Sequence, residues 1–189
     1  MTQQGKNAID LVLAESLIEL SAKKPIDKIT IKEITDKAGV IRPTFYNHFQ
    51  DKYELIEWII KTELLEPIKP LLNAGMIFEA IVLMLNNISA NSVFYKKALK
   101  LEGAVTFNQI AMKCVCEMFM NIISEKSTGK KSKYRWLTPE VISTYYAQSL
   151  CFITEGWIAQ GMDDIEPKEM GEAYMYLITR SMDDILSEL

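Results

Sequence analysis

Residues 30–52 read TIKEITDKAGVIRPTFYNHFQDK, and this stretch decides the fold of the N-terminal part of the chain. Thr30 and Glu33 have the spacing of a capping box, in which a hydroxyl and a carboxylate satisfy the free backbone N–H groups at a helix start. Ile29 and Ile34 stand where a hydrophobic staple would fix the angle at which the chain enters the helix. The sequence therefore predicts a helix that begins directly after Thr30.

A glycine ends this helix within a few turns. Gly39 suits the left-handed backbone that closes a helix. A second helix follows, because Pro43 is accepted in a first turn, where its missing N–H would have no partner, and it biases Arg42 away from helical angles. Asp51 and Glu54 then open a further helix. Two short capped helices joined by such a turn have the size of a helix-turn-helix, whose second helix enters the DNA major groove.

Residues 42–49 are the candidate recognition helix. Phe45 and Phe49 are four residues apart and are expected to face inward. The side chains between them are then available to DNA: arginine can pair with guanine, threonine can touch a thymine methyl or a phosphate, and a tyrosine hydroxyl donates to phosphate. For the histidine, a structural hydrogen bond and a phosphate contact are equal alternatives. The side chains expected to be available are Arg42, Thr44, Tyr46 and His48.

The same residues carry a pattern that resembles the signature of the TetR/AcrR regulators. It runs from Ile29 to Ile34, through AGV at 38–40, to TFYNHF at 44–49 and Lys52. The resemblance implies that the tyrosine, the histidine and the lysine contact phosphates, and that the other polar positions touch bases or backbone. Lys52 would add its charge to the free N–H groups of a helix start. The expected DNA-binding residues are Thr30, Lys32, Arg42, Pro43, Thr44, Tyr46, His48 and Lys52.

One position departs from that pattern. Many members of the family carry Ser or Asn where Ile41 stands, so the recognition helix is expected to lack a side-chain cap. Ile41 would then pack inward or lie against a thymine methyl group.

The rest of the chain shows the period of helices rather than strands. An apolar face over residues 9–20 marks a first helix, and Pro67 and Pro70 break the pattern after the helix at 52–65. The prediction is an all-α chain with a three-helix helix-turn-helix domain at 1–52, the fourth helix at 52–65 as connector, and a helical ligand-sensing and dimerisation domain at 66–189. Later segments with helical period are 76–88, 104–124, 139–160 and 168–188.

The last two segments predict a homodimer. Apolar residues repeat at a spacing of three to four through 168–188, and this seam is expected to pair with 139–160 and with a second copy as a four-helix bundle. The TetR/AcrR resemblance implies the same, because those regulators dimerise through their last two long helices. Residues 157–162 and 167–170 further resemble a subgroup that includes regulators of dihydroxyacetone kinase operons.

Segment 104–124 is apolar around much of its circumference, as a helix at the centre of a bundle would be. We expect it to line a cavity for a small apolar effector that lowers operator affinity. The alternatives are that these side chains simply fill the core, or that a partner protein takes the effector's place. The expected ligand-binding residues are Met84, Phe107, Cys114, Met118, Phe119, Tyr145, Tyr146 and Phe152.

Composition narrows the function further. The net charge of −4 argues against indiscriminate nucleic-acid binding, although residues 1–52 carry +1 against −5 for the remainder. Three cysteines in apolar surroundings fit a reduced, cytoplasmic setting, and two cysteines two apart on a helix point to opposite sides, so no metal site is expected. With no membrane-length apolar run, phosphate loop or nucleophile-base pair, we expect no membrane span, no cofactor and no enzyme. The predicted function is a DNA-operator-binding repressor, with activation or control by a partner protein as the alternative.

Overall fold

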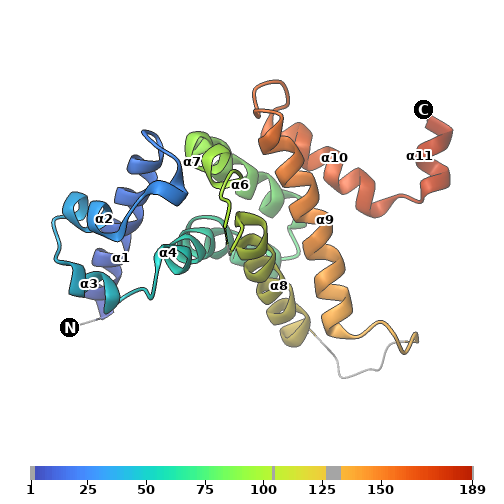
Figure 1. Ribbon diagram of the computed structural model, residues 1–189. Coiled ribbons are helices and arrows are strands. Elements are labelled where there is room, and N and C mark those ends of the chain that lie inside the picture. Colours follow the sequence, from blue (N-terminus) through green and yellow to red (C-terminus); the bar gives the residue numbers. More distant parts are fainter. Residues whose placement is uncertain (1–2, 104, 127–132, 189) are drawn as a thin grey trace.

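The computed structural model describes residues 3–103, 105–126 and 133–188, and within these ranges the regular elements are all helical (Figure 1). The all-α prediction is thereby confirmed. The helices, of which η1 is a 3-10 turn and η2 a π-helical segment, are α1 Gln3–Ser21, η1 Ile26–Lys28, α2 Ile31–Ala38, α3 Arg42–Tyr46, α4 Lys52–Ile59, η2 Ile60–Leu65, α5 Glu66–Asn73, α6 Ile77–Ala90, α7 Ser92–Ala98, α8 Phe107–Lys126, α9 Pro139–Ala159, α10 Pro167–Thr179 and α11 Met182–Glu188.

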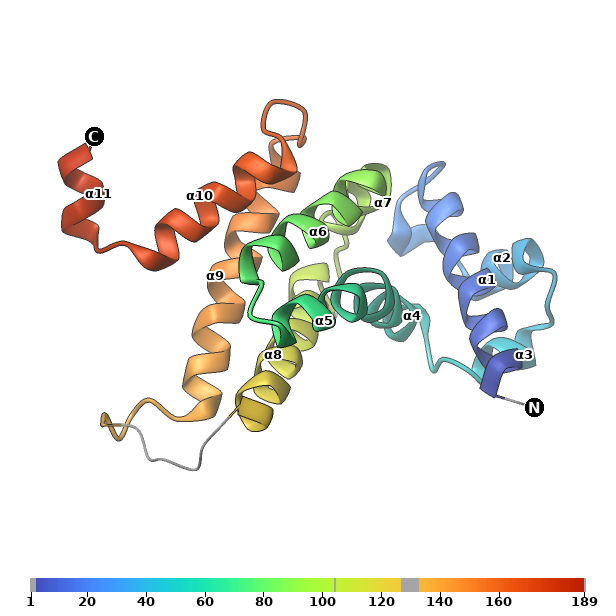
Figure 2. The ribbon, with the colours of Figure 1, turned by 180° about the vertical axis from the view of Figure 1, so that it is seen from behind.

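The first three helices contribute to a hydrophobic core that continues into the C-terminal helices. Leu13 and Leu17 of α1, Ile34 of α2 and Phe45 of α3 are fully buried, and Phe49 closes the core from the loop after α3. Because these residues recur at helical spacing, each short helix has one apolar face to contribute. This helix-turn-helix unit lies at one end of the molecule, and α11 lies at the other (Figures 1 and 2).

The connector is longer than expected, because the prolines do not end it. The helical path of α4 continues through η2 into α5 as far as Asn73, with Pro67 in the first turn of α5. Pro67 has no N–H to donate to the carbonyl of Glu63 four residues earlier. The side-chain amide of Asn87 on α6 donates to that carbonyl instead, at 2.9 Å. A wide π-helical turn and a side chain from a neighbouring helix thus replace the lost backbone bond.

The C-terminal bundle is built on α8 and α9, which pack along each other, while α10 crosses α6. Helices α6 and α8 begin and end within three residues of the predicted segments. Helix α7 was not predicted. In the described ranges no single helix is long and apolar enough to cross a membrane; α6 and α7 reach the required length and composition only as a pair bent by 88°.

The prediction of one helix over 168–188 is wrong. Helix α10 ends at Thr179, Arg180 is extended, and α11 starts at Met182. The cause is a capping box: the Ser181 hydroxyl accepts from Asp184 N at 3.2 Å, while the Asp184 carboxylate accepts from Ser181 N at 3.1 Å. The apolar residues of α11 are largely exposed, as Met182 and Leu186 are.

Close approach of α10 to α6 depends on Gly171. A Cβ at this position would stand 3.0 Å from Val82 Cγ2 and 3.5 Å from Phe78 Cε2. Gly171→Ala should therefore lower the free energy of unfolding by about 1–3 kcal/mol, because the two helices must separate. Urea denaturation measures this. Gly156→Ala on α9 is the matched control: nothing lies within 4 Å of its added Cβ, so it should stabilise by up to about 1 kcal/mol. Equal effects of the two variants would contradict the packing argument.

Candidate DNA-binding site

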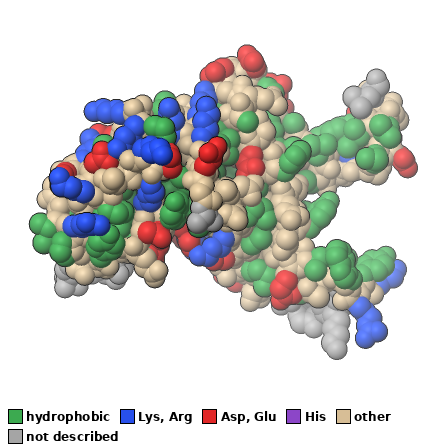
Figure 3. All heavy atoms as spheres, viewed as in Figure 1, with side chains coloured by type: hydrophobic (Ala, Val, Ile, Leu, Met, Phe, Trp, Pro, Cys, Tyr) green, Lys and Arg blue, Asp and Glu red, His purple; other side chains and the backbone are tan. Residues whose placement is uncertain are grey.

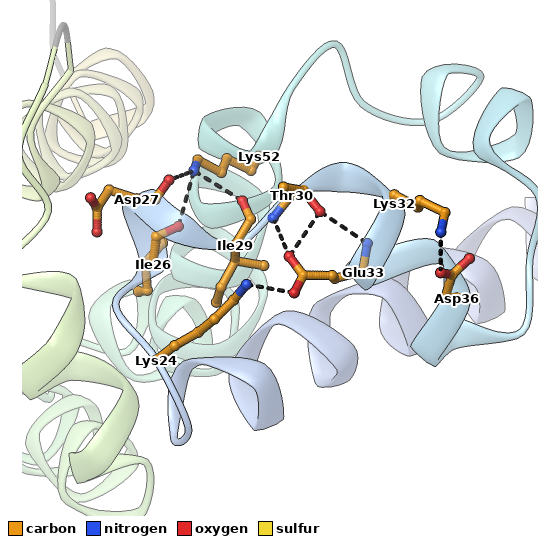
Figure 4. A network of polar contacts seen from close by, with 9 residues as sticks. All are labelled: Lys24, Ile26, Asp27, Ile29, Thr30, Lys32, Glu33, Asp36 and Lys52. Atoms are coloured by element: carbon orange, nitrogen blue, oxygen red, sulfur yellow. Dashed lines mark hydrogen bonds and ion pairs between the residues drawn. The ribbon is translucent and has the colours of Figure 1, made fainter.

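The predicted capping box positions α2. Glu33 N donates to Thr30 Oγ1 at 3.3 Å and Thr30 N donates to Glu33 Oε2 at 2.9 Å (Figure 4). Lys24 donates to the other carboxylate oxygen at 2.5 Å. This hydrogen bond, followed by those from the Thr30 backbone and hydroxyl, lowers the pKa of Glu33 to about 2. The carboxylate therefore stays ionised and holds the helix start at any physiological pH.

The turn between α2 and α3 has the geometry that its glycine allows. Gly39 adopts φ 68° and ψ 26°, in the left-handed region that favours glycine, and Val40 N donates to Thr35 O at 3.1 Å. Ile41 is then extended at the start of α3 and makes no side-chain cap, as expected. Ile41 is 69% exposed, so of its two expected orientations the inward one is excluded.

Helix α3 presents a polar face above a buried aromatic base. Phe45 and Phe49 point inward, as predicted. On the outside, Arg42 Nη2 donates to Tyr46 Oη at 3.1 Å, and the guanidinium lies 5.6 Å from the ring centroid. Tyr46 is about half exposed, and Thr44 is partly exposed between them. An exposed guanidinium, two hydroxyls and an apolar Ile41 are groups that can contact phosphates, base edges and thymine methyls.

His48 does not lie on this face. Its side chain is 2% exposed, and Nδ1 lies 2.6 Å from Asp10 Oδ1 on α1, which is itself almost buried. The expectation that His48 is available to DNA is wrong, and the alternative of a structural hydrogen bond holds in this structure. Helix α3 ends at Tyr46, so His48 falls in the turn after it, where the backbone directs the ring towards α1. The sequence contains no local signal that pairs positions 10 and 48.

Lys52 is placed at the start of α4, but its ammonium is already occupied. Nζ donates to the backbone carbonyls of Ile26 at 3.0 Å, Asp27 at 2.7 Å and Ile29 at 3.1 Å (Figure 4). Partial burial lowers the pKa of Lys52, and the nearby Asp27 opposes this. In this structure Lys52 therefore ties the loop around η1 to the start of α4. A phosphate contact through this side chain requires that it exchange these partners.

The remaining predicted DNA-binding residues lie on α2 and α3 or directly before α2. Lys32 is largely exposed on α2, 3.6 Å from Asp36, and Pro43 is exposed in the first turn of α3. Thr30 is exposed, although its hydroxyl and N–H are both used by the capping box. Lysine and arginine side chains are scattered over the helix-turn-helix end of the surface together with hydrophobic ones (Figure 3). Dispersed cations are typical of a small DNA-binding site rather than of a broad surface that binds any polyanion.

The residues expected to line one ligand cavity separate into several environments. Met84, Met118, Phe119 and Tyr146 line a hollow of about 380 Å³ between α5, α6, α8, α9 and α10. Phe107 and Met84 line a second cavity of about 40 Å³.

Three of the expected residues do not line either cavity. Cys114 is buried and points towards the carbonyl of Glu57 on α4. Tyr145 and Phe152, at 64% and 75% exposed, lie on the outer face of α9 and away from these two cavities, so both are corrections to the predicted lining. Phe152 instead lines a wide, open hollow of about 800 Å³ between the end of α7 and the C-terminal half of α9. Tyr145 and Phe152 are seven residues apart and therefore share one face of α9. Helical periodicity identifies such a face but does not say whether it points outward or inward.

Two hydroxyl-bearing residues in the small cavity were missed, Tyr95 and Thr154. Tyr95 lies on the unpredicted α7, and Thr154 lies within an otherwise apolar stripe of α9. A polar residue in such a stripe is the signal that could have identified Thr154.

The geometry is that of a helix-turn-helix DNA-binding protein with a C-terminal helical bundle. Residues 15–59 match the family described as bacterial regulatory proteins of the tetR family, and residues 76–180 match the transcriptional regulator C-terminal region that accompanies it. The chain belongs to the tetR family of bacterial regulatory proteins. It is a DNA-binding transcriptional regulator and not an enzyme.

Individual relatives agree with this assignment. The HTH-type dhaKLM operon transcriptional activator DhaS of Lactococcus lactis subsp. lactis is 26% identical over 152 residues, which is 79% of either chain. A solved structure of a dihydroxyacetone kinase operon activator DhaS has a TM-score of 0.63 and 21% identity, over 90% of this chain and 93% of that one. NalD, the secondary repressor of the MexAB-OprM multidrug efflux pump in Pseudomonas aeruginosa, has a TM-score of 0.59 and 12% identity, over 92% of this chain and 96% of that one. The expected subgroup resemblance is thus confirmed, and the structural matches support the fold.

Proposed function

We propose that the chain binds a double-stranded DNA operator as a homodimer and controls transcription in response to a small molecule. The observation that carries the DNA-binding part is the exposed Arg42–Tyr46 pair of α3, held over the buried Phe45 and Phe49. Residues 1–52 would be the reader, 52–65 the connector, and 66–189 the sensing and dimerisation region. The proposed DNA contacts are Thr30, Lys32, Ile41, Arg42, Pro43, Thr44 and Tyr46, with Lys52 joining them if it exchanges its carbonyl partners.

Arg42→Ala tests whether α3 recognises DNA bases. Loss of a good base contact should reduce the preference for operator over scrambled DNA by about 1–3 kcal/mol, while scrambled DNA is bound almost as before. Fluorescence anisotropy with both duplexes, at several salt concentrations, measures the difference. Arg135→Ala, which removes an exposed arginine that precedes α9, is the matched control and should change neither affinity. An unchanged operator preference in Arg42→Ala would remove α3 from base recognition.

The homodimer is supported by an apolar face on the last long helices. Tyr145 and Phe152 of α9 and Leu177 of α10 are large apolar side chains exposed in the single chain. Exposed apolar surface of this kind marks an interaction site. A two-fold dimer would also place two copies of α3 about 34–36 Å apart, one turn of DNA.

For the direction of control, we propose activation. The support is the curated relative at 26% identity, which is named a transcriptional activator, and it outweighs the repression expected from the sequence. Deletion of the gene should therefore lower expression of the operon that the regulator binds. A rise in expression after deletion would restore the repressor interpretation.

For the effector, we propose a small molecule in the hollow of about 380 Å³ between α6, α8, α9 and α10. Its lining is mainly aliphatic and aromatic, and its size falls within the range of small-molecule sites. An occupant can change DNA binding only if it prefers one arrangement of the two readers over another. The connector is the proposed lever, because Glu57 of α4 is held by Lys61 at 2.7 Å and by Lys113 of α8 at 2.8 Å.

A further inference from the structure

Two hydroxyl groups inside the helical bundle have no hydrogen-bond partner. Among the described residues, Tyr95 Oη and Thr154 Oγ1 are the buried side-chain polar atoms for which none is found. Tyr95 is 0% exposed on α7, and Thr154 is 9% exposed on α9. A buried hydroxyl that makes no hydrogen bond costs stability, and native proteins keep few of them without a reason.

The side chains of Tyr95 and Thr154 both line the same small cavity. It measures about 40 Å³, whereas one water needs roughly 10–15 Å³, so there is room for about three water-sized groups. The rest of the lining is almost entirely apolar and comprises Ile60, Leu64, Leu65, Met84, Ile88, Phe107, Ala111, Val115, Leu150, Cys151 and Ile158, with Glu155 as the one charged member. Two hydroxyl-bearing side chains in such a wall can orient one polar group.

This cavity adjoins the larger hollow. Met84 and Leu150 line both spaces, so these two side chains stand between them. Methionine is unbranched and adapts readily to a new occupant, and a rotation of Met84 would join the spaces. The joined volume would have a polar inner end, at Tyr95 and Thr154, and an apolar outer part between α6, α8, α9 and α10.

The surroundings of the inner end favour a neutral occupant, because burying any charged group in an almost entirely apolar lining is costly. Burial raises the pKa of the Glu155 carboxyl, which accepts a hydrogen bond from Asn108. Burial, and then the nearby Glu63 carboxyl, raise the pKa of Tyr95, so its phenol stays protonated and can donate or accept. An anionic group placed here would face two carboxyl groups in a low-dielectric setting, which is unfavourable.

We propose that Tyr95 and Thr154 bind the uncharged hydroxyl or carbonyl head of a small molecule whose apolar tail lies in the larger hollow. The inference rests on the proposed function, since it names the chemistry of the effector sensed by the helical bundle. It replaces the purely apolar effector expected from the sequence with one that has a single polar end.

The test uses 1-hexanol, hexane, hexanoate and hexylamine as probes. Binding is followed by NMR of methyl-labelled methionine and isoleucine in the intact protein, where Met84 and Ile88 report on the small cavity. Hexanol should bind about tenfold more tightly than hexane, as one well-placed hydrogen bond provides. Tyr95→Phe and Thr154→Val should each reduce that ratio towards one and leave hexane binding unchanged. Tyr146→Phe, which removes a hydroxyl beside the larger hollow only, is the control and should keep the ratio.

A second measurement does not need a ligand. If the two hydroxyls are unpaired in the free protein, Tyr95→Phe and Thr154→Val should each raise its Tm by a few degrees, because an unsatisfied group is removed. A fall in Tm in both variants would mean that water already satisfies the hydroxyls, and this would overturn the proposal. So would equal binding of hexanol and hexane, tighter binding of either charged probe, or no binding at all.

Measuring operator affinity in the presence of hexanol distinguishes a failure of the proposed binding site from a failure of the proposed sensing function. If hexanol binds with the stated preference but operator affinity does not change, the assigned site stands and the sensing role fails. If no probe binds, the proposed binding site is wrong, while the proposed DNA contacts and the proposed homodimer are still decided by their own experiments.

Discussion

Replacing Lys52 by methionine is expected to lower the free energy of unfolding by about 2–4 kcal/mol and to weaken binding to every DNA sequence. The ammonium donates to three backbone carbonyls around η1. In the variant Ile26 O keeps the N–H of Ile29 as a donor, while Asp27 O and Ile29 O lose the ammonium. Each buried carbonyl that loses its partner costs about 1–3 kcal/mol, less where water can replace the donor. Methionine keeps most of the aliphatic volume, so the loss reports on the ammonium. Chemical denaturation and DNA titrations measure the two effects.

Salt dependence separates the structural role of Lys52 from a direct phosphate contact. If the side chain only holds the loop around η1, affinity falls but the slope of log K against log salt is unchanged. If it exchanges its carbonyls for a phosphate on the DNA, the slope falls by about 1. Lys28→Met is the matched control, because Lys28 lies on η1 with its side chain mostly exposed and beside Asp27. Equal stability of Lys52→Met and Lys28→Met would contradict the structural role.

Local chemistry explains why the helix-turn-helix could be predicted from the sequence. The Thr30–Glu33 box, the left-handed Gly39 and the proline in the first turn of α3 each act within a few residues, so their effects can be recognised without a fold. The inward direction of Phe45 and Phe49 follows from helical spacing. Helical spacing does not predict which residue a polar side chain contacts. Asp10, the partner of His48, lies 38 residues away in the sequence.

In the C-terminal bundle, helical spacing predicts the surroundings of a side chain even less well. Helical period assigns apolar side chains to a face, but it does not say whether that face meets another helix, a cavity or the outside. Met118 and Phe119 lie beside the larger hollow, whereas Phe152, which is expected in the same lining, is 75% exposed on the outer face of α9. The break before α11 is different, because Ser181 and Asp184 have the spacing of a capping box that an apolar repeat running through it concealed.

Placing charges on the exposed apolar face of α9 and α10 is expected to disrupt the homodimer. Phe152→Glu combined with Leu177→Glu should convert a homodimer into monomers and weaken operator binding about 100-fold or more. Two linked readers gain a factor of roughly 10²–10⁴ over one, and that gain is lost when the copies separate. Each carboxylate would also have to be buried without a partner for the interface to form. Analytical ultracentrifugation at micromolar concentration and DNA titration of the same samples measure both effects.

Val93→Glu is the control for that experiment. This substitution also adds a carboxylate at an exposed apolar position, but on α7 rather than on α9 or α10. The control variant should remain dimeric and bind the operator as the unaltered chain does. A sedimentation profile that shows monomers for the unaltered chain would contradict the dimer itself. Dimers that survive both glutamates on α9 and α10 would instead move the interface elsewhere, and the exposed apolar residues of α11, Met182 and Leu186, would then be the next positions to charge.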